Sequence, residues 1–125
     1  MSTQVTVCQF VLSLTLMIAS NAYCQNEIIV RENPMKAQSL SGRVQLGRSP
    51  EGVKGVLVED CTNKWSTVKA WTYTDGNGHF SFANVSPKKI HYLRLSFHGA
   101  HTLLIKVKIC GSAQKELLLV LNFKT

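Results

Sequence analysis

The sequence contains few carboxylates, and this shortage limits the chemistry that the chain can perform. Only 7 of its 125 residues are Asp or Glu, against 14 Lys and Arg, and charged residues make up 17% of the chain. Glu59 and Asp60 are adjacent, but neighbouring positions on a strand point to opposite faces, so they form no general acid–base pair. Neither a nucleophile–base spacing nor a glycine-rich phosphate loop occurs. The sequence therefore predicts a protein that is not an enzyme, has no catalytic residues and uses no cofactor.

Potential metal ligands are also too scattered to form a site. His98 and His101 stand three residues apart across an expected turn, yet a zinc site needs three or four ligands and no carboxylate lies near them in sequence. His79 and His91 could join them only through the fold. The His-x-x-Glu pair of zinc peptidases does not occur. We expect no metal site.

The N-terminal segment lacks both a positive charge and an apolar run of membrane length. No Lys or Arg occurs before Arg31, and polar residues interrupt the apolar stretch 5–19 before it reaches the roughly 18 residues of a spanning helix. Small residues precede two cleavage points, after Ala22 and after Cys24, as in a secretory signal peptide. We expect residues 1–24 to be a signal peptide, without the usual positive n-region. The mature protein would be periplasmic, displayed on the outer surface or secreted, with Cys24 removed, retained or lipidated.

The next segment, residues 25–38, is expected to be a flexible leader. Asn33-Pro34 breaks regular structure, and polar residues dominate after Val30. The short stretch Glu27-Ile28-Ile29-Val30 could add one edge strand. The folded domain is therefore predicted to begin at residue 39 and to end at residue 125.

Helical periodicity is absent throughout this domain, whereas apolar and polar residues alternate at regular spacing. Residues 102–110 show the pattern most clearly, with apolar side chains on one face and lysines on the other, as in a sheet with one wet face. The sequence Asp75-Gly76-Asn77-Gly78 predicts a tight β-hairpin. We expect one antiparallel seven-stranded β-sandwich of the prealbumin or immunoglobulin type. The expected strands are 40–46, 56–59, 65–74, 79–82, 91–98, 102–110 and 116–123.

Several stretches, taken in order, resemble the carboxypeptidase regulatory-like domain family. They are Ser41-Gly42-Arg43-Val44, residues 52–58, residues 74–82, and Tyr92-Leu93-Arg94-Leu95-Ser96 followed by His98-Gly99. The resemblance implies a prealbumin-like, carbohydrate-binding-like sandwich and a non-catalytic module, here of the stand-alone exported bacterial kind. It identifies a scaffold rather than a chemistry. The related transthyretin-like hydrolases end in Tyr-Arg-Gly-Ser, whereas this chain ends in Leu-Asn-Phe-Lys-Thr.

Three aromatic residues are the first candidates for ligand binding. Trp65, Trp71 and Tyr73 fall on one face of the expected third strand. If that face is wet, flat rings with polar tips could stack on sugar rings. If it faces the core, the same rings pack the interior.

A basic strip supplies the second candidates. Arg94, Lys106 and Lys108, with Lys115 added, are expected on the wet face of one sheet. Such a strip would attract acidic polysaccharide or an anionic outer surface, or it would discourage edge-to-edge pairing of strands. The remaining basic residues are spread along the chain, so no nucleic-acid patch is expected.

Cys61 and Cys110 are the cysteines that follow Cys24. Export would permit a disulfide between them, whereas the alternation of the two strands turns both side chains outward and favours two separate thiols.

The residues together predict an exported, non-catalytic module that binds a polysaccharide or a cell-envelope protein and meets a membrane only by association. The alternatives are an accessory protein without a ligand of its own, and an uncharted enzyme.

Overall fold

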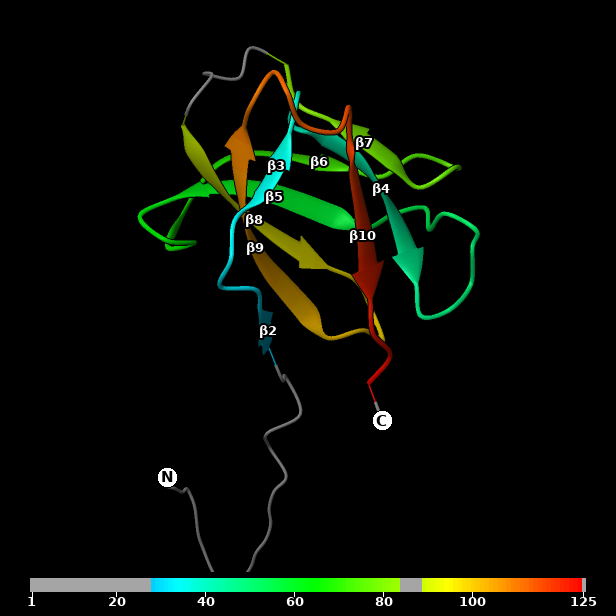
Figure 1. Cartoon of the computed structure of the whole chain (residues 1–125). Helices are drawn as coiled ribbons and strands as arrows, with labels where there is room; N and C mark the ends of the chain where they lie inside the picture. Colours follow the sequence, from blue (N-terminus) through cyan, green and yellow to red (C-terminus); the bar gives the residue numbers. More distant parts are fainter. Residues whose placement is uncertain (1–27, 84–88, 125) are drawn as a thin grey trace, which may run out of the picture.

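The computed structural model describes residues 28–83 and 89–124, which form β-strands and turns (Figure 1). Within these two ranges there is no helix, and thus none of the length and apolarity that a membrane span requires. Nine strands are arranged in two sheets. They are β2 (Ile28–Val30), β3 (Met35–Ala37), β4 (Ser41–Leu46), β5 (Leu57–Thr62), β6 (Thr67–Tyr73), β7 (His79–Ser81), β8 (Ile90–Ser96), β9 (Thr102–Ile109) and β10 (Leu117–Leu121).

The larger sheet has the strand order β2-β9-β8-β5-β6, and β3 follows β2 along the same edge of β9. The pairs β8–β9, β5–β8 and β5–β6 are antiparallel, whereas β2 and β3 both run parallel to β9. Strand β6 forms one edge of this sheet, and its register with β5 is shifted at one point. There Asp60 pairs with Ala70 and Cys61 with Val68, so Lys69 is an extra residue in a β-bulge.

The smaller sheet has the order β10-β4-β7, with β10 parallel and β7 antiparallel to β4. The near-continuous apolar run of residues 116–123 predicts a central or well-covered strand, but β10 lies at an edge of this sheet and its side chains alternate between the core and solvent. Leu117, Leu119 and Leu121 are buried, whereas Leu118 and Val120 between them are 55% and 42% exposed.

One hydrophobic core receives the buried side chains of both sheets. Val44 and Phe80 come from the smaller sheet, and Val58, Leu93 and Ile105 from the larger one. Burying an aliphatic side chain of this size contributes about 1.5–3 kcal/mol, so the core is the main source of stability. In β9 the apolar side chains that alternation places on one face are buried, as predicted: Leu103, Ile105, Val107 and Ile109.

The predicted single antiparallel seven-stranded sandwich is wrong in two respects. The described residues are all-β, but they form nine strands in two sheets. Strand β9 in the larger sheet and strand β4 in the smaller one each have a parallel and an antiparallel partner. Alternation determines which face a side chain takes but carries no information on the direction of the neighbouring strand. In addition, β2 and β3 lie within residues 25–38, where the sequence predicts a leader with at most one strand. Ala37 at the end of β3 is fully buried. The predicted signal peptide lies outside the described residues.

The predicted hairpin at residues 75–78 is a tight turn between sheets rather than a hairpin. The Asp75 carboxylate accepts hydrogen bonds from the backbone N–H groups of Asn77 and His79, at 2.9 and 3.0 Å. However, β6 before the turn pairs with β5, and β7 after it pairs with β4. The turn also packs against Gly52 so closely that a Cβ at residue 52 would lie 1.8 Å from the carbonyl oxygen of Asn77.

A candidate binding face on the larger sheet

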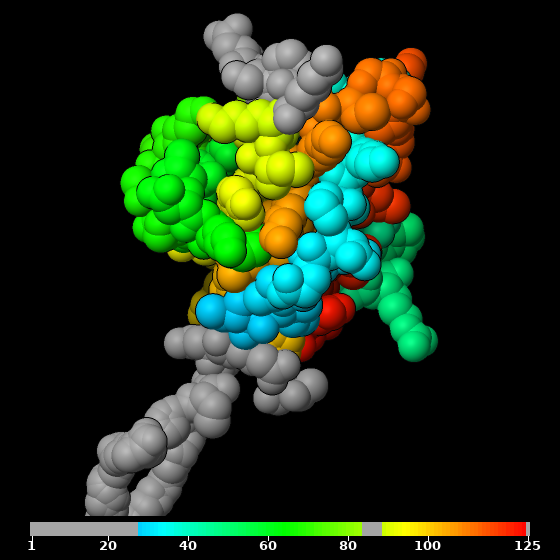
Figure 2. Space-filling model, turned by 60° about the vertical axis from the view of Figure 1, so that its left-hand side comes forward, coloured from blue at the N-terminus to red at the C-terminus, as the bar shows by residue number. Residues whose placement is uncertain are grey.

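The outer face, meaning the side of the larger sheet that is turned away from the core, carries most of the predicted site residues. Figure 2 shows a side of the molecule on which the β5–β6 hairpin (green), β8 (yellow), β9 (orange) and the β2–β3 segment (cyan) lie next to one another. The cross-strand registers place on the outer face the side chains of Trp71 and Tyr73 (β6), Leu57, Glu59 and Cys61 (β5), Ile90, Tyr92 and Arg94 (β8), Lys106 and Lys108 (β9) and Lys36 (β3).

Trp71 and Tyr73 are the most exposed aromatic rings on this face. Their exposed fractions are 62% and 55%. The ring centroids are 5.6 Å apart and the ring planes meet at 78°. The two rings therefore form a corner on the edge strand, open to solvent, as the wet-face interpretation of the sequence requires.

Trp65 is not in a row with these rings, which corrects the sequence prediction. The chain at residues 63–65 has φ values of 50, 53 and 68°, so these residues form a left-handed turn, and β6 begins only at Thr67. The turn carries the half-buried indole of Trp65 across the sheet. Its Nε1–H donates to the backbone carbonyl oxygens of Leu93 at 3.0 Å and Ile105 at 3.3 Å. The ring meets Tyr92 edge to face at 5.1 Å. Trp65 is thus a packing residue.

Arg94 lies in the centre of the outer face and is already engaged by the protein. Its Nε donates to the Glu59 carboxylate at 2.8 Å, and its Nη1 donates to the backbone carbonyl oxygen of Trp65 at 3.3 Å. The hydrogen bond to Glu59 raises the pKa of the guanidinium. Arg94 therefore holds the β5–β6 turn against the sheet, and the Glu59 carboxylate balances the charge of the guanidinium.

The three lysines of the predicted basic strip have different neighbours in the structure. Lys106 lies 4.0 Å from the Glu32 carboxylate. Lys108 is exposed and pairs in register with Lys36 of β3, a residue that sequence reasoning missed because it was assigned to the leader. Lys115 precedes β10 of the smaller sheet, and its backbone carbonyl oxygen accepts a hydrogen bond from the Ser39 hydroxyl at 3.3 Å.

Both described cysteines are free thiols. Strand β8 separates β5, which carries Cys61, from β9, after which Cys110 follows, so the two strands are about 10 Å apart, beyond the reach of a disulfide. Burial raises the pKa of Cys61. The pKa of Cys110 is lowered, first by its hydrogen bonds from Ser112 and then by the charges of Lys36 and Lys108.

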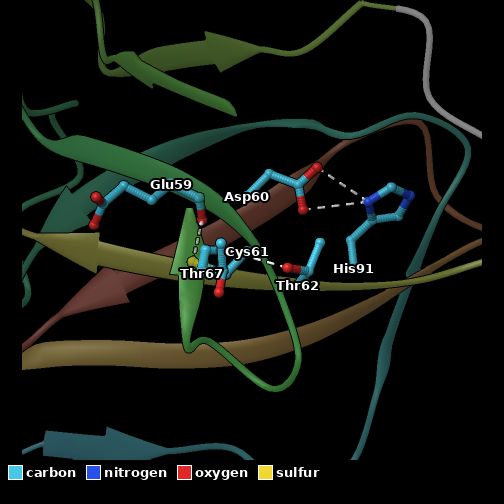
Figure 3. A network of polar contacts seen from close by, with 6 residues as sticks. All are labelled: Glu59, Asp60, Cys61, Thr62, Thr67 and His91. Carbon is cyan, nitrogen blue, oxygen red and sulfur yellow. Dashed lines mark hydrogen bonds and ion pairs between the residues drawn. The ribbon is translucent and has the colours of Figure 1, made fainter. Parts of the chain in front are cut away.

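A buried polar pair, Asp60 and His91, occupies the inner side of the same strands (Figure 3). The His91 Nδ1 lies 3.2 and 3.3 Å from the two carboxylate oxygens, and the side chains are only 4% and 7% exposed. Nε2, on the far side of the ring, has no hydrogen-bond partner. A cavity of about 260 Å³ adjoins the pair; it is lined by Asp60, Cys61, Thr62, Asn63, Lys69, Lys89, Ile90, His91 and Tyr92.

This pair does not form a catalytic triad within the described part of the chain. No hydroxyl or thiol is hydrogen-bonded to His91, and the Thr62 hydroxyl instead lies 3.5 Å from the carbonyl oxygen of Thr67. Sequence reasoning missed the pair because its members are 31 residues apart and meet only through the β5–β8 register. Among residues 28–83 and 89–124, three or more potential metal ligands do not gather at any point.

Comparison of the chain with protein-family models finds no match, and comparison with curated proteins finds none either.

Proposed function

We propose that this chain is an exported, non-catalytic β-sandwich module that binds a glycan through Trp71 and Tyr73. The observation that carries the proposal is the exposure of these rings, 62% and 55%, next to each other on the edge strand β6. Burying a large apolar side chain is worth about 1.5–3 kcal/mol, which the fold forgoes at both positions. A ligand that covers the two rings would recover this free energy.

The arrangement of the rings suits a sugar. Tyr and Trp combine a flat apolar surface with a polar group at the edge, and a pyranose ring likewise has an apolar face and polar edges. Because the planes of Trp71 and Tyr73 meet at 78°, one sugar ring can stack on one aromatic ring while the other borders it. The half-buried Trp65 supports the turn beside them and is not part of the contact.

The all-β architecture is compatible with the resemblance to carboxypeptidase regulatory-like domains, which we retain as part of the proposal. Export, a location at the cell surface and the absence of catalysis belong to it as well. The competing proposal is an accessory protein without a ligand of its own. In that case no glycan would bind, and substitution of Trp71 or Tyr73 would change no binding measurement.

The test uses tryptophan fluorescence, since the chain has two tryptophans. Trp65→Phe keeps an aromatic ring against Tyr92 and leaves Trp71 as the reporter. We expect the emission of this variant to shift on titration with one class within a panel of neutral and acidic polysaccharides. Trp71→Ala and Tyr73→Ala, followed by calorimetry, should each weaken binding about tenfold or more, a loss of about 1.4 kcal/mol.

The matched control is Leu118→Ala, which removes a similarly exposed apolar side chain from the smaller sheet. Its affinity should equal that of the wild type. Absence of any fluorescence shift across the panel, or equal losses in Leu118→Ala and Trp71→Ala, would refute glycan binding at this face.

A further inference from the structure

We propose that the glycan is an acidic polysaccharide whose anionic groups bind between Lys36 and Lys108, the lysine pair at the far side of the outer face. This inference rests on the proposed function and names the class of ligand for the same face.

The lysine pair is an uncompensated charge on a face where the other cations are compensated. Lys36 and Lys108 are direct cross-strand partners, which places their Cβ atoms about 5 Å apart. Like charges directly opposite each other destabilise a sheet. Arg94 is paired with Glu59, and Lys106 lies 4.0 Å from Glu32. No carboxylate of the described residues lies within 4.0 Å of either member of the lysine pair.

The registers place this pair on the same face as the exposed rings. On the outer face, Lys108 of β9 is opposite Ile90 of β8. Four residues further along β8, Arg94 is opposite Glu59 of β5, and Glu59 is opposite Trp71 of β6. Three strand spacings and four residues along β8 separate the two ends, which amounts to about 20 Å. A ligand that reaches both ends is therefore an oligomer and not a single sugar.

The distribution of charges favours a polysaccharide over a nucleic acid. Proteins that bind single-stranded nucleic acid place aromatic rings within a positive groove that follows the backbone phosphates. On this face the rings and the lysine pair are at opposite sides of the sheet, and the Glu59 carboxylate lies beside Trp71, between the two ends. A polymer of carboxylated sugar rings instead presents an apolar ring face to the aromatic residues and carboxylates to the lysine pair.

Cys110 provides a chemical reporter beside the lysine pair. It follows β9 directly, and its pKa is lowered chiefly by the hydrogen bonds from Ser112 and further by the positive charges of Lys36 and Lys108, which favour the thiolate. An anion bound between the two lysines would offset these charges. The thiolate fraction of Cys110 would then fall, and alkylation of the thiol would become slower because the thiolate is the nucleophile.

The experiment compares polygalacturonate with its fully methyl-esterified form, on the full chain. Polygalacturonate should bind at least about tenfold more tightly at low salt, and its affinity should fall as salt is added. It should also slow the alkylation of Cys110 by iodoacetamide, measured peptide by peptide with mass spectrometry, whereas the methyl ester should leave the rate unchanged. Lys36→Gln/Lys108→Gln should abolish the preference for the acidic form.

The matched control, Arg48→Gln/Lys54→Gln, removes the same net charge from exposed residues of the connection between β4 and β5, and it should keep the preference. Equal binding of the acidic and esterified polymers, with loss of both in Trp71→Ala, would overturn this inference and leave the proposed function standing. No binding of either polymer, or of any other glycan in the panel, would overturn both. Equally strong, Trp71-independent binding of single-stranded DNA or of anionic phosphatidylglycerol vesicles would replace the polysaccharide with that partner.

Discussion

The β5–β6 turn allows a direct test of how much the Trp65 indole contributes to the free energy of unfolding. Its neighbour Lys64 has the same left-handed backbone conformation but is exposed. Lys64 and Trp65 have φ values of 53 and 68°. A left-handed conformation costs a residue with a Cβ roughly 1–2 kcal/mol, and replacement by glycine removes this cost. Glycine also makes the unfolded chain more flexible, which costs about 0.5–1 kcal/mol. Lys64→Gly, at an exposed position, should therefore stabilise the protein by about 0.5–1 kcal/mol.

Trp65→Gly should gain the same amount from the backbone and lose much more from the side chain. Half of a packed indole, about 100 Å² of area, is worth about 2–3 kcal/mol. The edge-to-face contact with Tyr92 adds about 1 kcal/mol, and the hydrogen bonds to Leu93 and Ile105 add about 1 kcal/mol together. The net expectation is a loss of about 3–4 kcal/mol, hence a difference of about 4 kcal/mol between the two glycine variants.

The assay is equilibrium urea unfolding followed by far-ultraviolet circular dichroism, which does not depend on the tryptophan that is removed. A difference of about 4 kcal/mol corresponds to a midpoint shift of about 2 M urea between the variants, for m-values of small domains. Trp65→Phe, which keeps the ring but lacks the N–H group, should fall between them. Midpoints of Lys64→Gly and Trp65→Gly that agree within the error of the measurement would refute the role assigned to the indole.

The remaining predictions concern two carboxylates. Asp60→Ala should lower the free energy of unfolding by about 1–3 kcal/mol, because it leaves Nδ1 of the buried His91 without its partner. Asp60→Asn keeps an acceptor and should lower it less. Equal losses in urea unfolding would contradict a stabilising hydrogen bond between Asp60 and His91. At Asp75 the backbone N–H groups of His79 and Asn77 hold the carboxyl pKa below its ordinary value of 3.8. The folded-state pKa is thus depressed, so its contribution is present at neutral pH and is lost as the pH falls below about 4. Asp75→Asn should flatten the acid limb of the thermal stability curve, and an unchanged acid limb would show that the turn does not depend on this charge.

Sequence reasoning was most successful where a side chain's face follows from alternation alone. The inward positions of Val58, Leu93 and Ile105 and the outward position of Lys106 follow directly from period-two patterning, and they are confirmed. The same pattern carries no information on the direction of the partner strand. It therefore could not show that Leu117–Leu121 runs parallel to Ser41–Leu46.

The candidate site was predictable only in part, for local reasons. Trp71 and Tyr73 are two residues apart on an uninterrupted strand, so their shared face could be predicted. Trp65 could not be placed, since the bulge at Lys69 breaks the alternation and the left-handed turn redirects the chain. Asp60–His91 and Lys36–Lys108 arise from registers between distant strands, which no local signal in one sequence encodes.

The parallel attachment of β2 and β3 to β9 has a consequence for how the protein is made. Ile28 pairs with Thr102, which is 74 residues later, and Met35 pairs with Val107. During synthesis the ribosome releases β2 and β3 long before β9, which receives them, has been made, and contacts this distant in sequence form slowly. The nascent chain therefore carries two unpaired segments until its last quarter emerges, and this edge closes, with Lys36 beside Lys108, only after β9 has been made.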